Sequence, residues 1–335
     1  MKEMISMKGF SEIIGHEDIV EYLQNSLRNR KVSHAYIFNG EDGSGKNMLA
    51  GAFAKALECE AGYGDACNMC RSCMQFDSGS HPDIRYVSHE KPDIISVDEI
   101  REQVDRDVII KPYSSKYKIY IIDEAEKLPE RSQNALLKTI EEPPAYVVIM
   151  LLVNNAQALL PTVRSRCISL DLRAVDTDKI CDYLMKELRL PDYQARICAA
   201  YAQGNVGRAK AMASSDRFDA LNTFVIDLLK RLGEMDVYEI VFAIQEMMTY
   251  KSDIYDMIDL MEVWYHDVLI LKATNDTNHI VYRDEFRALN RKAVSSSYEG
   301  LENIMEALEK AKVRLRANVN FETAMELMLL TMKEN

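Results

Sequence analysis

Residues 35–58 join a short apolar segment, a glycine-rich loop and an amphipathic helix pattern. The segment AYIFNG (35–40) predicts a buried strand, and NMLAGAFAKALE (47–58) predicts a helix with Leu49 and Phe53 on its apolar face. Between them, GEDGSGKN (40–47) matches most of the phosphate-binding pattern G-x-x-x-x-G-K-[ST]. Strand, loop and helix in this order predict an α/β fold in which loop amides and a helix N-terminus face an anion.

The last residue of this motif departs from the pattern. The residues expected to contact a phosphate are Gly40, Gly43, Gly45 and Lys46. Asn47 stands where a serine or threonine hydroxyl would coordinate magnesium. An isolated motif of this length also occurs as an ordinary turn, so its assignment as a nucleotide site depends on the other segments of the chain.

Three further apolar segments predict strands of the same sheet: KIYIIDEAEKL (118–128), VVIMLLVNN (147–155) and CISLDL (167–172). Ser96 and Glu99 form a capping box that predicts a helix start between the strands. Alternating strands and helices predict a parallel sheet covered by helices on both faces. Polar residues follow two of the strands, and Asp123 is suited to hold magnesium while Glu124 is suited to orient a water molecule.

Four cysteines lie close together in CEAGYGDACNMCRSC (59–73). Cys59, Cys67, Cys70 and Cys73 are separated by seven, two and two residues, which suits a closed tetrahedral zinc shell without an open catalytic position. Buried free thiols are the alternative, but the segment is polar. His81 is a substitute ligand for which no position is missing, and we expect Cys167, Cys181 and Cys198 to lie in cores.

The C-terminal part has the character of a helical domain. All eight prolines lie at or before Pro191, and apolar residues recur every three or four positions over 253–271 and 321–332. We expect Trp264 and the many methionines there to fill the core.

Composition restricts the setting of the protein. The chain has 335 residues, of which 41 are lysine or arginine and 53 are aspartate or glutamate, so its net charge is −12 and any contact with DNA is expected to be local or made through partners. No apolar run approaches the roughly 20 residues of a membrane helix. The N-terminal residues have no long apolar segment, so we expect no secretory signal and a cytoplasmic protein, in which cysteines bind metal more often than they form disulfides.

These motifs together resemble the tau/gamma/delta-prime family of bacterial DNA polymerase III clamp-loader subunits, of the AAA+ class. The resemblance covers about the first 210 residues and includes IIGHEDIVEYLQNSL (13–27), HPDI (81–84), QNALLKTIEEPP (133–144) and LLPTVRSRC (159–167). It implies an AAA+ domain over 1–170 with a zinc module at 59–73, a helical lid over 171–212 and a helical collar over 213–335.

The resemblance also implies partners and roles. The chain would join tau/gamma and delta subunits in a ring that places a sliding clamp on primed DNA. Arg166 would be an arginine finger for the ATP of a neighbouring subunit, and Asn154 would occupy the position that senses the terminal phosphate. The ordinary alternatives are a surface arginine, a strand-end asparagine, and a Glu124 retained only for hydrogen bonding.

Two departures from the family pattern favour its delta-prime branch, whose members do not hydrolyse ATP. The first is Asn47. The second is GNVGRA (204–209), in which Gly207 stands where the ATPases carry a lid arginine and Arg208 is displaced by one residue, or about 100° around a helix. The alternatives are an active ATPase of the tau/gamma type and a zinc-ribbon nucleic-acid-binding protein with a basic face around Arg71.

Overall fold

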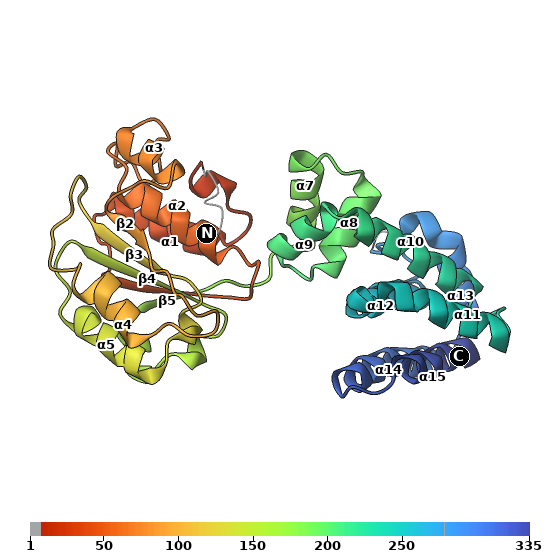
Figure 1. Ribbon diagram of the computed structural model, residues 1–335. Coiled ribbons are helices and arrows are strands. Elements are labelled where there is room, and N and C mark those ends of the chain that lie inside the picture. Colours follow the sequence, from red (N-terminus) through yellow and green to blue (C-terminus); the bar gives the residue numbers. More distant parts are fainter. Residues whose placement is uncertain (1–7, 278) are drawn as a thin grey trace. The chain divides into compact units, whose positions relative to one another are not determined.

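The computed structural model describes residues 8–277 and 279–335. Met1–Met7, which begin the segment in which we expect no secretory signal, and Asn278 lie outside the described residues. The chain forms two compact units: residues 1–176 with 204–207, and residues 177–203 with 208–335 (Figure 1). Among the described helices, none is long and apolar enough to span a membrane.

The first unit contains a five-stranded sheet in which every paired strand runs parallel, in the order β2-β3-β4-β1-β5. Its strands are β1 (Ala35–Asn39), β2 (Ile84–Tyr86), β3 (Lys118–Ile122), β4 (Val147–Val153) and β5 (Ile168–Asp171). The four strands predicted from the sequence are confirmed, and β2 is an additional edge strand. Because β1 lies between β4 and the edge strand β5, the glycine loop after β1 starts at the carboxyl end of an interior strand.

Helices cover both faces of this sheet, as predicted (Figure 1). On one face, Phe53 of the helix after the glycine loop packs with Tyr36 and Phe38 of β1. On the other, Leu136 and Ile37 belong to a second core cluster. The helical segments of this unit are η1 (Phe10–Glu12), α1 (Glu17–Arg28), α2 (Lys46–Leu57), α3 (Arg71–Asp77), α4 (Val97–Ile100), η2 (Arg101–Asp105), η3 (Ala125–Lys127), α5 (Glu130–Glu141), η4 (Ala156–Ala158) and α6 (Pro161–Arg164).

Two helices differ in detail from the sequence patterns. The capping box at Ser96 and Glu99 is present, but the α-helix that it starts ends at Ile100 and continues as the π-helical turn η2. The predicted apolar face of α2 is wider than expected, since every residue from Leu49 to Leu57 is buried. The helix is therefore a central element of the core and not a surface element with one apolar face.

The motif HPDI has a structural role that its letters do not reveal. Asp83 is buried, and its carboxylate accepts hydrogen bonds from the backbone amides of Tyr113, Ser114 and Ser115. Burial opposes its ionisation, but these amides and the Ser114 hydroxyl outweigh burial and hold the pKa of Asp83 below its usual range. Asp83 thereby fixes the loop that precedes β3.

Replacing Asp83 should destabilise the sheet unit. Asp83→Ala leaves three backbone donors without their acceptor, and we expect a loss of about 3 kcal/mol in the free energy of unfolding, measured by urea denaturation. Because the folded-state pKa is depressed, this contribution is present above the unfolded-state pKa of about 3.9 and is lost as the pH falls. A variant as stable as the wild type at pH 7 would contradict this role.

The second unit is entirely helical among its described elements. Its helices are α7 (Thr177–Glu187), α8 (Asp192–Tyr201), α9 (Val206–Ala213, whose first two residues belong to the first unit), α10 (Asp216–Arg231), α11 (Val237–Met247), η5 (Met248–Asp253), α12 (Ile254–Thr274), η6 (Arg283–Glu285), α13 (Phe286–Ser295), α14 (Tyr298–Arg316) and α15 (Phe321–Glu334). Trp264 and the methionines Met261, Met325 and Met328 are buried, which confirms the prediction that they fill the core.

Candidate functional site

The glycine loop connects the end of β1 to the start of α2. Gly45 is the residue before α2 and has a φ of 101°, a left-handed conformation that suits glycine. Gly43 also has a positive φ, of 83°. The backbone amide of Gly40 donates to the carbonyl of Val153 at 3.0 Å, which ties the loop to the end of β4. The sequence therefore folds locally as the motif predicts.

The lysine of the motif is bonded to the loop itself. Lys46 is buried, and its Nζ donates to the carbonyl oxygens of Gly40 at 2.7 Å and Glu41 at 3.1 Å. It also donates to the side-chain oxygen of Asn154, the predicted sensor residue, at 2.5 Å. A carboxylate oxygen of Asp42 lies 3.5 Å from the same nitrogen, so all three hydrogens of the ammonium group have acceptors within the protein. A phosphate would have to displace at least one.

The magnesium position contains an amide where the family pattern has a hydroxyl. Asn47 is exposed, and its Nδ2 lies 3.3 and 3.4 Å from the two carboxylate oxygens of Asp123. Glu124 pairs with Lys127 at 2.9 Å and lies 3.6 Å from the ring of His89. The structure thus brings the predicted residues to one edge of the sheet, with Asn47 bonded to the carboxylate that would hold the metal.

A segment distant in the sequence covers the loop within the first unit. The backbone amide of Gly207 donates to the carbonyl of Gly43 at 2.9 Å, and the side chain of Asn205 donates to the carbonyl of Asp42 at 2.6 Å. A Cβ at position 207 would lie only 2.7 Å from the Cα of Gly43. An arginine at this position would therefore collide with the backbone of the loop.

The neighbouring arginine is bonded within the helical unit. The guanidinium of Arg208 lies 4.4 Å from the ring centroid of Tyr201, donates to its hydroxyl at 2.8 Å and pairs with Asp259 at 3.1 Å. Three contacts of this kind hold a side chain in one orientation. Arg208 is thus fixed by residues of α8 and α12.

Arg166 lies between α6 and β5, at the surface of the sheet unit. Its side chain is 41% exposed, donates to the carbonyl of Thr162 at 3.0 Å and pairs with Glu141 of α5 at 3.0 Å. Glu141 is itself 46% exposed, so this ion pair is solvated and weak. None of these partners belongs to the glycine loop.

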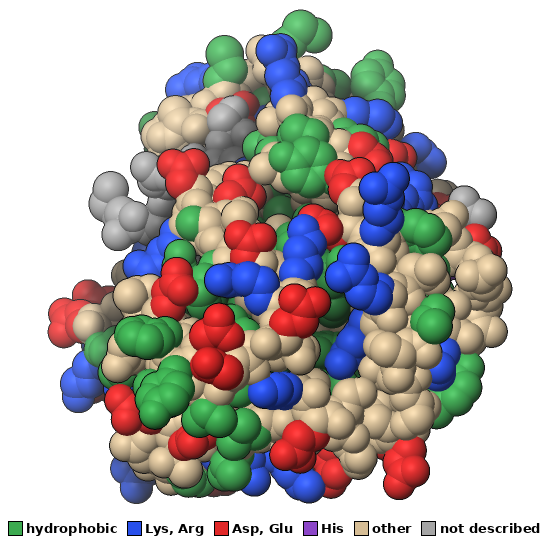
Figure 2. Space-filling view, turned by 90° about the vertical axis from the view of Figure 1, so that its right-hand side faces the viewer, with side chains coloured by type: hydrophobic (Ala, Val, Ile, Leu, Met, Phe, Trp, Pro, Cys, Tyr) green, Lys and Arg blue, Asp and Glu red, His purple; other side chains and the backbone are tan. Residues whose placement is uncertain are grey.

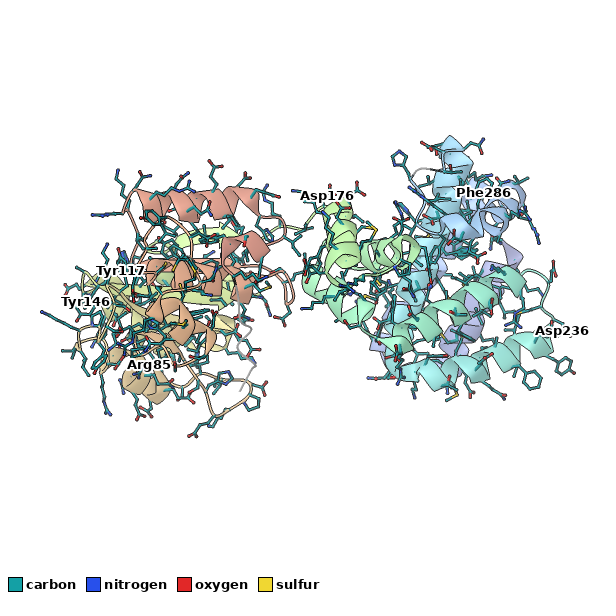
Figure 3. The ribbon with its side chains drawn as sticks, turned by 90° about the horizontal axis from the view of Figure 1, so that it is seen from above. Arg85, Tyr117, Tyr146, Asp176, Asp236 and Phe286 are labelled. Carbon is teal, nitrogen blue, oxygen red and sulfur yellow. The ribbon has the colours of Figure 1, made fainter. Side chains whose placement is uncertain are left out.

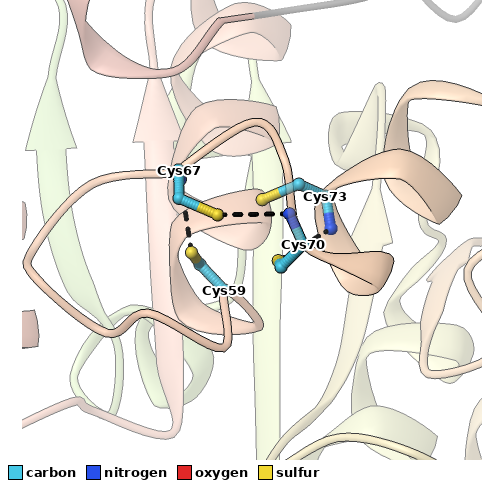
Figure 4. Close-up of side chains that lie close together, drawn as sticks. All are labelled: Cys59, Cys67, Cys70 and Cys73. Carbon is cyan, nitrogen blue, oxygen red and sulfur yellow. Dashed lines mark hydrogen bonds between the residues drawn. The ribbon is translucent and has the colours of Figure 1, made fainter.

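The four clustered cysteines are brought together between α2 and α3. The Sγ atoms of Cys59, Cys67, Cys70 and Cys73 all lie within 4.8 Å of one another (Figure 4). Backbone amides donate to sulfur at 3.3–3.4 Å, from Cys67 to Cys59, from Cys70 to Cys67 and from Cys73 to Cys70. Gly62 and Gly64, with φ of 65° and 90°, allow the intervening turn. Four sulfurs at this separation fit the ligand set of a structural zinc.

The thiols of the cluster differ in their environment. The backbone amides of Met69 and Cys70 lower the pKa of Cys67 to about 6, because they stabilise its thiolate. Burial raises the pKa of Cys73. A divalent cation would favour the thiolate at every one of these positions.

Two residues beside the cluster have roles that the sequence analysis did not assign. Lys55 is 1% exposed, and its Nζ donates to Asn68 at 2.7 Å and to Asp77 at 2.7 and 2.8 Å, which joins α2, the cysteine loop and α3. His81 is not a substitute ligand, because its ring nitrogens contact the hydroxyl of Ser72 at 3.0 Å and the amide of Asp83 at 3.2 Å. The role of Lys55 could have been inferred from the sequence, because a lysine between Ala54 and Ala56 interrupts an otherwise apolar helix.

The three remaining cysteines lie in or against cores, as predicted. Cys181 and Cys198 are buried, and Cys167 is partly buried against the second core cluster of the sheet. On the face shown in Figure 2, lysine and arginine side chains are interspersed with aspartate and glutamate. This face has no extended surface of one charge.

A parallel sheet with a glycine loop at its carboxyl edge, followed by a helical unit, defines an α/β protein of the phosphate-loop class. The family model described as DNA polymerase III, delta subunit, matches residues 15–176. The chain is 30% identical to the delta prime subunit of DNA polymerase III from Bacillus subtilis over 334 residues, which cover 98% of this chain and 99% of that protein. The chain belongs to the delta prime family of DNA polymerase III subunits.

Two other proteins are similar to the chain at lower sequence identity. The tau subunit from Bacillus subtilis is 28% identical over 342 residues, which cover 94% of this chain and 60% of that protein. A gamma subunit-related protein from Thermotoga maritima has a structure with a TM-score of 0.44 and 19% identity, covering 94% of this chain and 98% of that one.

Proposed function

We propose that this chain is a ring member of the DNA polymerase III clamp loader that does not hydrolyse ATP itself. Lys46 carries the proposal, because its ammonium group is bonded to the carbonyls of its own loop and to Asn154. Two further features also disfavour ATP hydrolysis: Asn47 has no hydroxyl to coordinate magnesium, and position 207 has a glycine where the ATPases carry an arginine. ATP with magnesium would bind weakly or not at all, since charge stabilisation by magnesium and lysine is central to phosphoryl transfer.

The isolated chain should therefore show negligible ATP hydrolysis even at saturating ATP. Asn47→Thr should not restore turnover, because position 207 still has a glycine in contact with Gly43 and no arginine to reach the phosphate. The measurement is the release of phosphate from ATP by the purified chain, with and without magnesium. Turnover of about 1 per second or more that Lys46→Ala abolishes would identify an active ATPase of the tau/gamma type instead.

The partners belong to the same proposal. The family role implies a ring with tau/gamma and delta subunits that acts on a sliding clamp and primed DNA, in the cytoplasm where the chromosome lies. Arg166 would complete the ATP site of a neighbouring subunit as an arginine finger, with a planar group suited to phosphate oxygens. Its exposure and its solvated pair with Glu141 support this role, since little is lost when the guanidinium changes partner.

Zinc is the cofactor that we propose for the four-cysteine cluster. All four ligands would come from the protein, so the ion would stabilise the module over 59–73 and supply no reactive position. The cluster geometry and the amide–sulfur hydrogen bonds support this assignment.

The predicted division into a sheet domain (1–170), a lid (171–212) and a collar (213–335) remains part of this proposal. Support for an oligomerising collar comes from α11, which exposes a cluster of apolar side chains beside Glu239 and Glu246. Tyr238 and Phe242 are 79% and 68% exposed, and Val241 lies beside them. The opposite face, with Ile240 and Ile244, is buried. An exposed apolar cluster on a helix that is already packed on its other side is typical of a subunit interface.

Phe242→Glu should weaken ring assembly without unfolding the chain. The side chain is exposed, so the isolated protein should keep its melting temperature, whereas a buried charge at an interface should reduce assembly affinity by about tenfold or more. Lys310→Ala, an exposed change on α14, serves as the control. The measurement is analytical ultracentrifugation of the mixed subunits, and assembly equal to that of the wild type would exclude this face.

A further inference from the structure

A cavity of about 590 Å³ lies beside the cysteine cluster, at the far end of α2 from the glycine loop. Residues from the ends of α1 and α2, from α3 and from the loop 114–117 line it. The loop lysine begins α2 and Leu57 ends it, so about 17 Å of helix separate the glycine loop from the cavity. The cavity is therefore distinct from the candidate nucleotide site.

Three cations line this cavity: Arg30, Arg71 and Lys116. They come from three separate segments, all three are exposed, and within the described part of the chain none of them forms an ion pair. Lys116 lies 4.9 Å from the ring centroid of Tyr117, which also lines the cavity. Tyr117 is labelled in Figure 3. Two acidic residues, Glu58 and Glu60, also line the cavity, so the three cations leave a small positive excess there in a chain of net charge −12, which favours binding of an anion.

Polar groups line the rest of the wall. Ser114, Ser115 and Gln75 supply hydroxyl and amide groups. Glu58 is 5% exposed; its Oε2 accepts from the amide of Tyr117 at 3.5 Å, and its Oε1 has no hydrogen-bond partner among the described residues. Buried polar oxygens are nearly always hydrogen-bonded. A carboxyl oxygen accepts a hydrogen bond in either protonation state, so a ligand donor would satisfy Glu58.

We propose that this cavity binds a small phosphorylated molecule of nucleotide size. Arginine and lysine hold phosphate oxygens through charge-assisted hydrogen bonds, here from Arg30, Arg71 and Lys116. A hydroxyl or amino group at the other end of the ligand would donate to Glu58. The volume is in the range of ordinary small-molecule sites. A nucleic-acid strand requires a basic track along its backbone, whereas these cations surround a single cavity.

The test is isothermal titration calorimetry of the full-length chain with adenosine 5′-monophosphate and guanosine 5′-monophosphate, in the wild type and in Lys46→Ala. At least one mononucleotide should bind equally to both proteins, because the glycine loop is not involved. The same nucleoside without its phosphate should bind at least about tenfold more weakly. Binding of neither mononucleotide at millimolar concentration, or binding that Lys46→Ala abolishes, would overturn the proposal.

Variants locate the site. Lys116→Ala should reduce the affinity about tenfold, and Lys111→Ala, an exposed lysine that does not line the cavity, should leave it unchanged. Arg71 adjoins Cys70, so the metal content and melting temperature of Arg71→Ala are measured along with its affinity. Lys116 lies on another wall of the cavity, so Lys116→Ala tests the site independently of the cysteine cluster. Equal binding by Lys116→Ala and the wild type would contradict the site. Displacement of the mononucleotide by a DNA oligonucleotide without terminal phosphates would point to strand binding instead.

Discussion

Arg166→Ala should slow ATP hydrolysis by the assembled clamp loader while leaving the chain folded. An arginine finger is worth about 10³–10⁵ in rate at a single site. Because other sites of the ring continue to turn over, we expect the DNA- and clamp-stimulated rate to fall by roughly tenfold, and clamp loading to fall with it. The isolated variant should keep its melting temperature, since it loses only a solvated pair with Glu141 and a bond to Thr162.

Two variants separate the finger from a general surface effect. Arg166→Lys should rescue poorly, because an ammonium group lacks the planar fork of the guanidinium. Glu141→Ala removes the same ion pair from the other side and frees the guanidinium, so the complex should hydrolyse ATP at the wild-type rate or faster. Unchanged ATPase and loading rates with Arg166→Ala would remove the finger from the account.

Loss of the metal should open the cysteine module. We expect about one zinc per chain in protein purified without chelator, and none in Cys70→Ser. Binding of structural zinc in finger peptides has an apparent free energy of about 10–16 kcal/mol, so the segment between α2 and α3 should become sensitive to protease. The strands of the sheet should remain folded, because their two core clusters contain none of the four cysteines.

Cys181→Ser is the matched control for this experiment. Cys181 is buried in the helical unit and lies outside the cluster, so its replacement should leave the zinc content unchanged. Protein without zinc whose four clustered thiols titrate freely, and whose protease sensitivity is the same with and without added zinc, would contradict a structural metal.

The sequence predicted the central part of the sheet because its strands are long and apolar. The edge strand β2 was missed, since Ile84–Tyr86 is only three residues long and half-buried, which is too short to show a period. The π-helical turn at Arg101–Asp105 was missed for another reason. Its residues follow an ordinary capping box, and the change of hydrogen-bond register has no signature in composition.

The candidate site was predictable where its residues adjoin strands. Asp123 and Asn154 follow β3 and β4 directly, so the sheet alone brings them to the glycine loop. The contact of Gly207 with Gly43 joins segments more than 160 residues apart and depends on tertiary packing. The buried Lys55 is similar, because its partners Asn68 and Asp77 lie in other elements and only the fold brings them together.

The central claim is that this chain does not hydrolyse ATP but contributes Arg166 to a neighbouring ATP site. Its most direct test compares a variant of its own glycine loop, Lys46→Ala, with Arg166→Ala in the same complex. The measurement is ATP turnover by the assembled clamp loader, stimulated by clamp and primed DNA, with the wild-type chain or with Lys46→Ala, after both are checked for equal melting temperature and assembly. We predict equal turnover, because Lys46 takes no part in hydrolysis. A fall with Lys46→Ala as large as that expected for Arg166→Ala would contradict the account.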